Sequence, residues 1–198
     1  MISIAVVGSA STGKSSVANA VFGTAFPVDA RSGSTREVLR RVVGDLEVID
    51  APPDTAPEAD AYLLVCDKDL TATEFRHLRD LRGRKRPVAI ILNKADTYDA
   101  AQLTGLLRHI RSRVRDFLTL EDVIACAADP VRIVHWEHSD GRISEHGVPT
   151  QADVEPVIAI VRSLTAEARA SVRVRSRELG RRLATSLRER LREDVSEK

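Results

Sequence analysis

The sequence predicts an α/β fold in which a mostly parallel sheet carries helices on both faces. Apolar runs of strand length alternate along the chain with longer stretches of helical periodicity. A glycine-rich loop directly follows the first apolar run, and a second polar motif directly follows a later one. Ligands bind at the carboxyl ends of the strands in such a sheet, so we expect the functional site at that edge.

The elements can be placed in order from their composition and periodicity. We expect strands at residues 2–7, 38–43, 46–49, 60–66, 87–92 and 122–126, and helices at 16–22, 71–82, 100–118 and from near 152. Gly44 and Asp45 form a two-residue turn signal between the second and third strands, which predicts an antiparallel hairpin there.

Residues 8–15 read G-S-A-S-T-G-K-S and lie between the first strand and the first helix. This order of elements is the context that a phosphate-binding loop requires, because backbone N–H groups and a helix N-terminus then converge on one point. Gly8 and Gly13 allow the tight turn, while Lys14 can reach a phosphate and the Ser15 hydroxyl can bind Mg²⁺. The expected phosphate-binding residues are Gly8, Ser11, Thr12, Gly13, Lys14, Ser15 and Ser16.

The strand at 87–92 ends in Asn93-Lys94-Ala95-Asp96. The carboxylate of Asp96 can accept two hydrogen bonds at once from guanine, whereas adenine would leave it partly unpaired. The stem of Lys94 can cover the base, and Asn93 can tie this loop to the phosphate loop. A motif of this kind after a phosphate-binding loop predicts a guanine nucleotide as the ligand.

Over roughly residues 1–128 these motifs resemble the translation-factor-like class of P-loop GTPases, and within it Era-like and dynamin-like proteins. The resemblance implies the three-layer, doubly wound P-loop fold and Mg²⁺-dependent binding of GTP and GDP. Residues 31–36, R-S-G-S-T-R, are similar to switch I, which implies that Thr35 completes the Mg²⁺ ligands. The resemblance thus implies catalytic roles for Lys14 and Thr35, and metal binding by Ser15, Thr35 and Asp50.

Residues 50–53, D-A-P-P, resemble the D-x-P-G start of switch II. Proline 53 replaces the glycine whose N–H contacts the γ-phosphate, and Asp54 stands where a catalytic Gln is expected. About ten residues remain before the next strand, too few for the usual helix. Residues 124–128, I-A-C-A-A, are similar to the loop that contacts the guanine carbonyl, which implies base contacts from Cys126 and the N–H of Ala127.

Three functions therefore stay open. The first is a GTPase with slow intrinsic hydrolysis that works as a switch through dimerisation or a partner. The second, favoured by Pro53, is a GTP- and GDP-binding scaffold without hydrolysis, whose C-terminal helix binds a partner. The third is an Era-like GTPase associated with the ribosome or with RNA, although no RNA-binding module is evident.

The overall composition bears on which partners and which cellular compartment to expect. A formal net charge of +1 gives no electrostatic case for nucleic acid, so we expect no nucleic-acid partner. The only cysteines, Cys66 and Cys126, lie in apolar runs and favour a reducing, cytoplasmic compartment. No apolar run approaches the ~18 residues of a membrane span, and the N-terminus does not resemble a signal peptide.

Two segments remain outside the nucleotide motifs. Residues 131–136 could be an edge strand followed by a turn at 139–141, with Trp136 packed over the base-side loops. The three nearby histidines match no metal-site spacing. We expect a GTP-binding domain at residues 1–165 and a helical extension at 166–198. The apolar stripe of that helix favours self-association or a protein partner over simple packing on its own domain, and peripheral membrane contact stays open.

Overall fold

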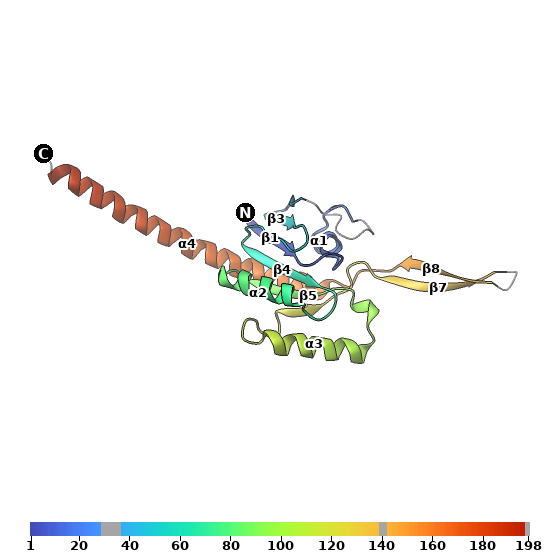
Figure 1. Ribbon diagram of the computed structural model, residues 1–198. Helices are drawn as coiled ribbons and strands as arrows, with labels where there is room; N and C mark the ends of the chain where they lie inside the picture. Colours follow the sequence, from blue (N-terminus) through green and yellow to red (C-terminus); the bar gives the residue numbers. More distant parts are fainter. Residues whose placement is uncertain (29–36, 139–141, 197–198) are drawn as a thin grey trace.

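The computed structural model describes residues 1–28, 37–138 and 142–196, with the backbone alone for residues 180, 184 and 186–196. Its core is a sheet with helices on both sides, and two long elements project from it (Figure 1). The expected α/β class is confirmed.

Six strands form the main sheet in the order β2-β3-β1-β4-β5-β6. The strands are β1 (Ile2–Val7), β2 (Leu39–Val43), β3 (Leu46–Asp50), β4 (Ala61–Cys66), β5 (Val88–Leu92) and β6 (Val123–Ala125). All neighbours are parallel except β2 and β3, which form the predicted hairpin around Gly44 (φ 60°). The carboxyl ends of β1, β3, β4, β5 and β6 therefore meet at one edge.

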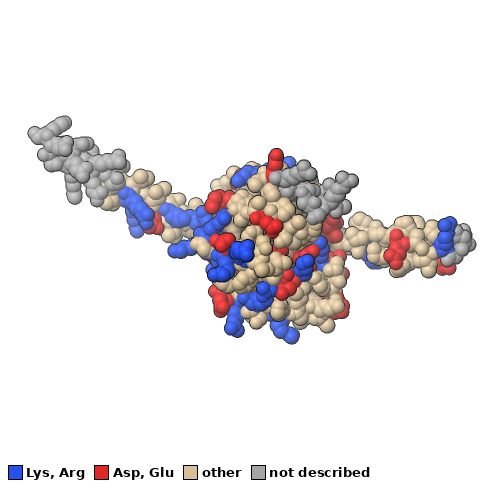
Figure 2. Space-filling view, viewed as in Figure 1, with Lys and Arg blue, Asp and Glu red and all other residues tan. Residues whose placement is uncertain are grey.

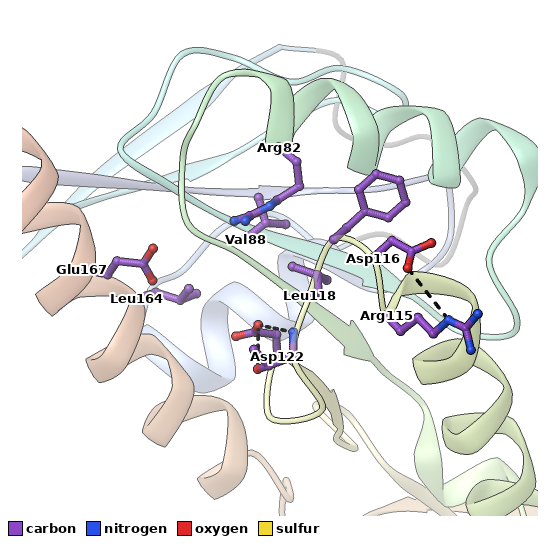
Figure 3. A pocket seen from close by; sticks show the side chains of 10 residues that line it. Arg82, Val88, Arg115, Asp116, Leu118, Asp122, Leu164 and Glu167 are labelled. Atoms are coloured by element: carbon purple, nitrogen blue, oxygen red, sulfur yellow. Dashed lines mark hydrogen bonds and ion pairs between the residues drawn. The ribbon is translucent and has the colours of Figure 1, made fainter.

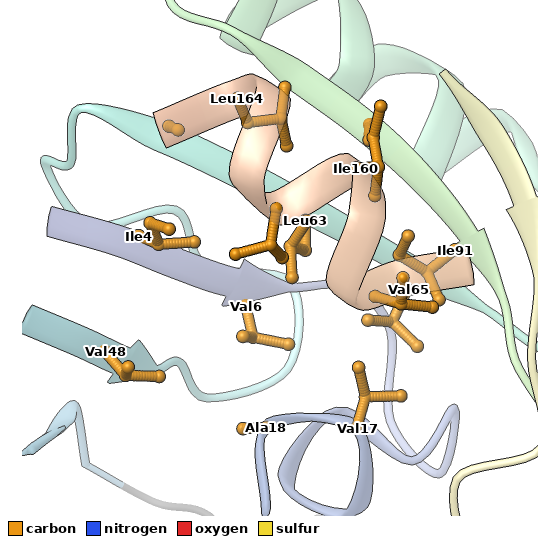
Figure 4. Packing of buried hydrophobic residues seen from close by; sticks show 14 of the residues in the cluster. Ile4, Val6, Val17, Ala18, Val48, Leu63, Val65, Ile91, Ile160 and Leu164 are labelled. Carbon is orange, nitrogen blue, oxygen red and sulfur yellow. The ribbon is translucent and has the colours of Figure 1, made fainter. Parts of the chain in front are cut away.

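Four α-helices lie in the sequence order that the periodicity predicts. They are α1 (Lys14–Phe22), α2 (Ala72–Gly83), α3 (Ala100–Val114) and α4 (Glu155–Ser196). Helices α1 and α4 pack on one face of the sheet, and α2 and α3 pack on the other. Figure 4 shows the first of these faces, where Ile160 and Leu164 of α4 and Val17 of α1 lie over Leu63 and Val65 of β4.

Side chains fix the starts of α2 and α3. The hydroxyl of Thr71 accepts the N–H of Glu74, whose carboxylate accepts the N–H of Thr71 in return, and Asp99 and Gln102 repeat this reciprocal cap. Helix α3 ends at Val114, four residues earlier than predicted. The N–H groups of both Phe117 and Leu118 donate to the carbonyl of Val114 and close the helix in a turn.

The segment between β3 and β4, residues 51–60, contains turns and no helix, as its length predicted. Thr55 donates both its N–H (3.3 Å) and its hydroxyl (2.8 Å) to the carbonyl of Pro52. These two bonds hold the segment in a tight turn beside the phosphate loop.

Residues 131–149 differ from the expected edge strand. They form a separate hairpin of β7 (Val131–Glu137) and β8 (Ile143–Pro149), which does not join the main sheet. The expected turn at residues 139–141 lies outside the described residues. Trp136 does not pack over the base-side loops: it is 57% exposed and contacts the ring of His146 within the hairpin, with the ring centroids 5.0 Å apart and the planes tilted.

Helix α4 is 42 residues long, and it begins with Pro156 in its first turn as the sequence predicted. One side of its first part is buried as far as Ala168, and Val172 still packs on the core. Ion pairs from Arg169 to Asp45 and from Arg175 to Asp60 then hold the helix to the sheet edge. The helix crosses residue 165 without a break, so the two-part division stays a prediction.

Beyond Arg175 the helix leaves the core (Figure 1), and Leu179 and Leu183 are both more than half exposed. Figure 2 shows positive side chains along the described part of this projection, while charges of both signs are mixed over the visible face of the core. Within the described residues, no helix combines the length and the apolar character needed to cross a membrane.

The central position of Leu63 predicts a large stability effect. Its side chain is fully buried between α4 and the sheet, so Leu63→Ala should lower the free energy of unfolding by about 2–5 kcal/mol. Urea denaturation followed by circular dichroism measures this change. The matched control, Leu183→Ala on the exposed part of α4, should change it by less than about 0.5 kcal/mol. Equal losses for the two variants would contradict this packing.

Candidate functional site: a phosphate loop beside a base-sized cavity

The loop between β1 and α1 has the backbone of a phosphate-binding loop. Gly8, Ser11 and Gly13 have φ angles of 142°, 62° and 84°. A Cβ atom at Gly8 would lie 2.2 Å from the carbonyl oxygen of Val65, and one at Gly13 would lie 2.3 Å from Nδ2 of Asn93. Both glycines are therefore required by close contacts as well as by φ.

Lys14 is the buried cation of this loop. Its side chain is almost inaccessible, and its Nζ donates a hydrogen bond to the carbonyl of Ser9 at 2.8 Å. Burial lowers the pKa of Lys14, and the opposing fields of Asp50, Asp54 and Glu74 do not fully offset it. An anion bound here would stabilise the charged ammonium, which is what a phosphate group would do.

Ser15 and Asp50 meet at the carboxyl end of β3. The Ser15 hydroxyl donates to Oδ2 of Asp50 at 2.6 Å, and Asp50 is fully buried. A hydroxyl and a carboxylate at this spacing fit Mg²⁺, which prefers oxygen ligands and keeps several waters. Ser15 would hold the ion directly and Asp50 through a water. Thr35, the third expected ligand, lies outside the described residues.

Asn93 connects the phosphate loop to the opposite side of the site. Its Nδ2 donates to the carbonyl of Thr12 at 3.0 Å. Its Oδ1 accepts the N–H of Ala128 at 3.1 Å and the thiol of Cys126 at 3.5 Å. One buried amide therefore links the loops after β1, β5 and β6, as the sequence predicted for its contact with the phosphate loop.

Lys94 is also held against the phosphate loop. It has a left-handed backbone (φ 59°), and its Nζ donates to the carbonyl of Ser11 at 2.6 Å and to Asp67 at 2.8 Å. The hydroxyl of Tyr98 donates to the carbonyl of Asp67 at 2.7 Å. Sequence reasoning missed Asp67, although its place directly after β4, at the ligand-binding edge, could have indicated it.

A cavity of about 300 Å³ lies beside these contacts, and this size suits a nucleobase. It is lined by Gly13, Ser16, Asn93, Lys94, Asp96, Thr97, Asp129 and Val131. Asp96 lies on a short 3₁₀ turn, η1 (Ala95–Thr97), whose position is fixed by the hydrogen bond from the N–H of Ala95 to the carbonyl of Cys126. Asp129 and Val131, at the root of the hairpin, were not predicted.

Cys126 and Ala127 do not line this cavity, and their contacts with a base stay a prediction. The N–H of Ala127 donates to the carbonyl of Asp153 at 3.0 Å, and the N–H of Cys126 donates to the carbonyl of Leu92 at 2.9 Å. The Ala127 N–H is thus used in a bridge to the residues just before α4. Cys126 is buried, which raises the pKa of its thiol to about 12, and it contacts the site through Asn93 and through the N–H of Ala95.

The start of switch II lies against the phosphate loop. Pro53 has no N–H to offer a phosphate. The next residue, Asp54, donates its N–H to the carbonyl of Gly8 at 3.2 Å and accepts the hydroxyl of Ser9 at 3.2 Å. A carboxylate therefore lies beside the loop at the place where the sequence lacks the expected Gln.

A second cavity, of about 440 Å³, lies at the other end of β5 (Figure 3). Arg82, Val88 and Leu118 line it together with Leu164 and Glu167 of α4. Its charges are mixed, and none of the predicted site residues reaches it. The part of the chain that the structure describes also holds no group of three His, Cys, Asp or Glu side chains placed to bind a metal. The cavity beside the phosphate loop is thus the candidate site.

Comparisons with known proteins agree with this geometry. The family model for 50S ribosome-binding GTPases matches residues 3–94. The probable transmembrane GTPase FZO-like, chloroplastic, of Arabidopsis thaliana is 25% identical over 163 residues, which cover 60% of this chain but 18% of the relative.

Among solved structures, Aquifex aeolicus Era bound to GDP.AlF4− has a TM-score of 0.54 and 19% identity, covering 65% of this chain and 52% of Era. A probable GTP-binding protein, EngB, has a TM-score of 0.51 and 16% identity, covering 64% of this chain and 89% of that protein. These two structures show a shared fold. The phosphate loop, Asp50 and the start of the base motif all lie within residues 3–94, so over this part the chain is similar to the 50S ribosome-binding GTPase family.

Proposed function

We propose that this chain binds GTP and GDP with Mg²⁺, hydrolyses GTP slowly, and works as a switch through dimerisation or a partner. The observation that carries the proposal is the link through Asn93, which holds a phosphate loop and a base-sized cavity at a fixed separation. One nucleotide can then be gripped at both ends.

The base would bind in the cavity at Asp96. Its carboxylate would accept the two guanine donors, N1–H and the exocyclic amino group, which adenine cannot offer together. Lys94 would cover the base plane, because its contacts with Ser11 and Asp67 hold its side chain across the cavity.

The phosphates would bind on residues 8–16. Lys14 would leave the carbonyl of Ser9 to contact the β- and γ-phosphates, and Ser15, Thr35 and Asp50 would hold Mg²⁺. The ion would supply charge stabilisation for phosphoryl transfer when bound. This chain's own part is then to position the phosphates and exclude competing geometries, which is most of what such a reaction needs.

Hydrolysis should be slow without help. Pro53 cannot donate an N–H to the γ-phosphate, and no Gln follows it to orient the attacking water. A second copy or another protein could supply the missing group. The exposed Leu179 and Leu183 of α4 lie four residues apart on one side of the helix and offer an apolar surface for such contact.

Pro53 also favours a second candidate function, a guanine-nucleotide-binding scaffold that does not hydrolyse GTP. The description of the matched family likewise keeps a ribosome-associated role open. For localisation we propose the cytoplasm, because Cys66 and Cys126 are buried free thiols rather than a disulfide.

Asp96→Asn should exchange guanosine for xanthosine nucleotides, because the new amide can donate to the xanthine carbonyl. We expect GDP affinity to fall and XDP affinity to rise by at least about tenfold each, as measured by isothermal titration calorimetry. Asp116→Asn, at the other end of the sheet, should change neither affinity. Unchanged GDP binding in Asp96→Asn would show that the base lies elsewhere.

Lys14→Ala should weaken binding of a non-hydrolysable GTP analogue by more than about tenfold, or about 1.4 kcal/mol. The physical reason is the loss of the one buried cation in the phosphate loop. Fluorescent-nucleotide titration gives the affinity, and Lys68→Ala, an exposed lysine after β4, serves as the control. Equal affinity in the two variants would remove the phosphate-loop assignment.

Multiple-turnover phosphate release separates the switch from the scaffold. We expect a slow rate per chain that rises with protein concentration, and a faster rate in Pro53→Gly, because glycine restores an N–H at this position. Lys14→Ala provides the baseline without hydrolysis. Zero release at every concentration in both the wild type and Pro53→Gly, with GTP still bound, would favour the scaffold instead.

A further inference from the structure

We infer that Asp54 makes this site hold GDP more tightly than GTP. The inference rests on the proposed nucleotide binding and concerns its regulation. Its basis is the position of one carboxylate against the part of the phosphate loop that faces the terminal phosphate.

Asp54 is attached to the first two residues of the phosphate loop. Its N–H donates to the carbonyl of Gly8, and its Oδ1 accepts the hydroxyl of Ser9, both at 3.2 Å. Ser9 is also the residue whose carbonyl accepts the ammonium of Lys14, at 2.8 Å. The carboxylate of Asp54 and the ammonium of Lys14 are thus both bonded to Ser9, one at its hydroxyl and the other at its carbonyl.

The terminal phosphate is the part of the ligand that approaches this place. The base cavity lies next to Gly13, Asn93 and Asp96, at the other side of the loop. A nucleotide that spans the two ends brings its last phosphate toward Lys14 and Asp54. GTP therefore meets the field of Asp54 with one more phosphate group than GDP, and that group is the nearest to it.

Three carboxylates surround the ammonium of Lys14, and Asp54 is the one whose repulsion of a γ-phosphate is least offset. Asp50, Asp54 and Glu74 all act on the ammonium of Lys14. Asp50 is paired with Ser15, and the carboxylate of Glu74 caps α2 through Thr71, so these two have structural partners. Asp54 is different because it is exposed and belongs to no helix or strand. Its neighbour Pro53 adds no N–H that would offset the repulsion of a γ-phosphate.

The backbone holds the carboxylate in place before any nucleotide binds. Asp54 is in the left-handed region (φ 57°), inside the turn closed by the bonds from Thr55 to Pro52. Asparagine adopts this region readily, so Asp54→Asn removes the charge and keeps the turn. The variant therefore isolates the electrostatic effect.

Affinities for GDP and for the analogue GMPPNP, each with Mg²⁺, test the inference in the full chain. We expect the wild type to prefer GDP, and Asp54→Asn to raise GMPPNP affinity about fivefold, which corresponds to about 1 kcal/mol, with GDP affinity within about twofold of wild type. This gain in GMPPNP affinity should shrink as the salt concentration rises from about 0.05 to about 0.5 M, because salt screens exposed charges. Ser9→Ala, which releases the carboxylate, should act in the same direction and more weakly.

Glu58→Gln is the matched control, because Glu58 is an exposed carboxylate in the same segment, near Arg84 rather than the phosphate loop. It should change neither affinity. Equal shifts for GDP and GMPPNP in Asp54→Asn, or no shift, would overturn the inference while leaving the proposed function standing. A folded wild type that binds neither nucleotide would instead contradict the proposed function, and this inference with it.

Discussion

The buried amide of Asn93 is the contact on which the geometry of the site depends. It bonds to the carbonyl of Thr12 on one side and to the N–H of Ala128 on the other, so three loops that are far apart in the sequence keep fixed positions. The approach leaves no room for a side chain at Gly13, 2.3 Å from the amide nitrogen. The glycine of one motif and the asparagine of the other are therefore two halves of a single contact. A buried amide without these partners would lower the stability of the fold, so the same hydrogen bonds that shape the site also stabilise the arrangement of the loops.

The parallel sheet places the loops that Asn93 links at one edge. Strands β1, β3, β4 and β5 end at one edge, and each delivers a polar residue directly after or at its last position: the phosphate loop after β1, Asp50 on β3, Asp67 after β4 and Asn93 after β5. Two fully packed faces hold the strand ends rigidly, because helices cover both. The direction of the strands therefore determines where a ligand would bind, and the residue types at the strand ends determine which ligand it would be.

The sequence predicts these parts well for a physical reason. A strand buried on both faces must be a continuous apolar run, and β4 and β5 have no exposed position that would blur the pattern. Residues 131–149 have the opposite character: nearly every side chain of the hairpin is exposed, so no core selects one face and the pattern cannot tell an edge strand from a free hairpin. The hydrogen bond of the Ala127 N–H could not be predicted from the sequence, because its acceptor, Asp153, lies in a segment far along the chain. Asp129 joins the cavity only because that hairpin begins there.

The segment after β3 is where the proposed preference for GDP and the proposed slow hydrolysis would both arise. A glycine at position 53 would attract the γ-phosphate through its N–H, and Pro53 removes that attraction. The turn that Pro52 and Thr55 close then places the carboxylate of Asp54 at Ser9 instead. In the proposed complex both effects would act on the third phosphate and leave base binding unchanged, because Asp96 and Lys94 line the cavity at the other end of the site. Such a site would favour a resting state with GDP bound. On this proposal a partner that contacts the exposed turn at Asp54 would shift the balance toward GTP, either by supplying a hydrogen-bond donor or by moving the carboxylate away.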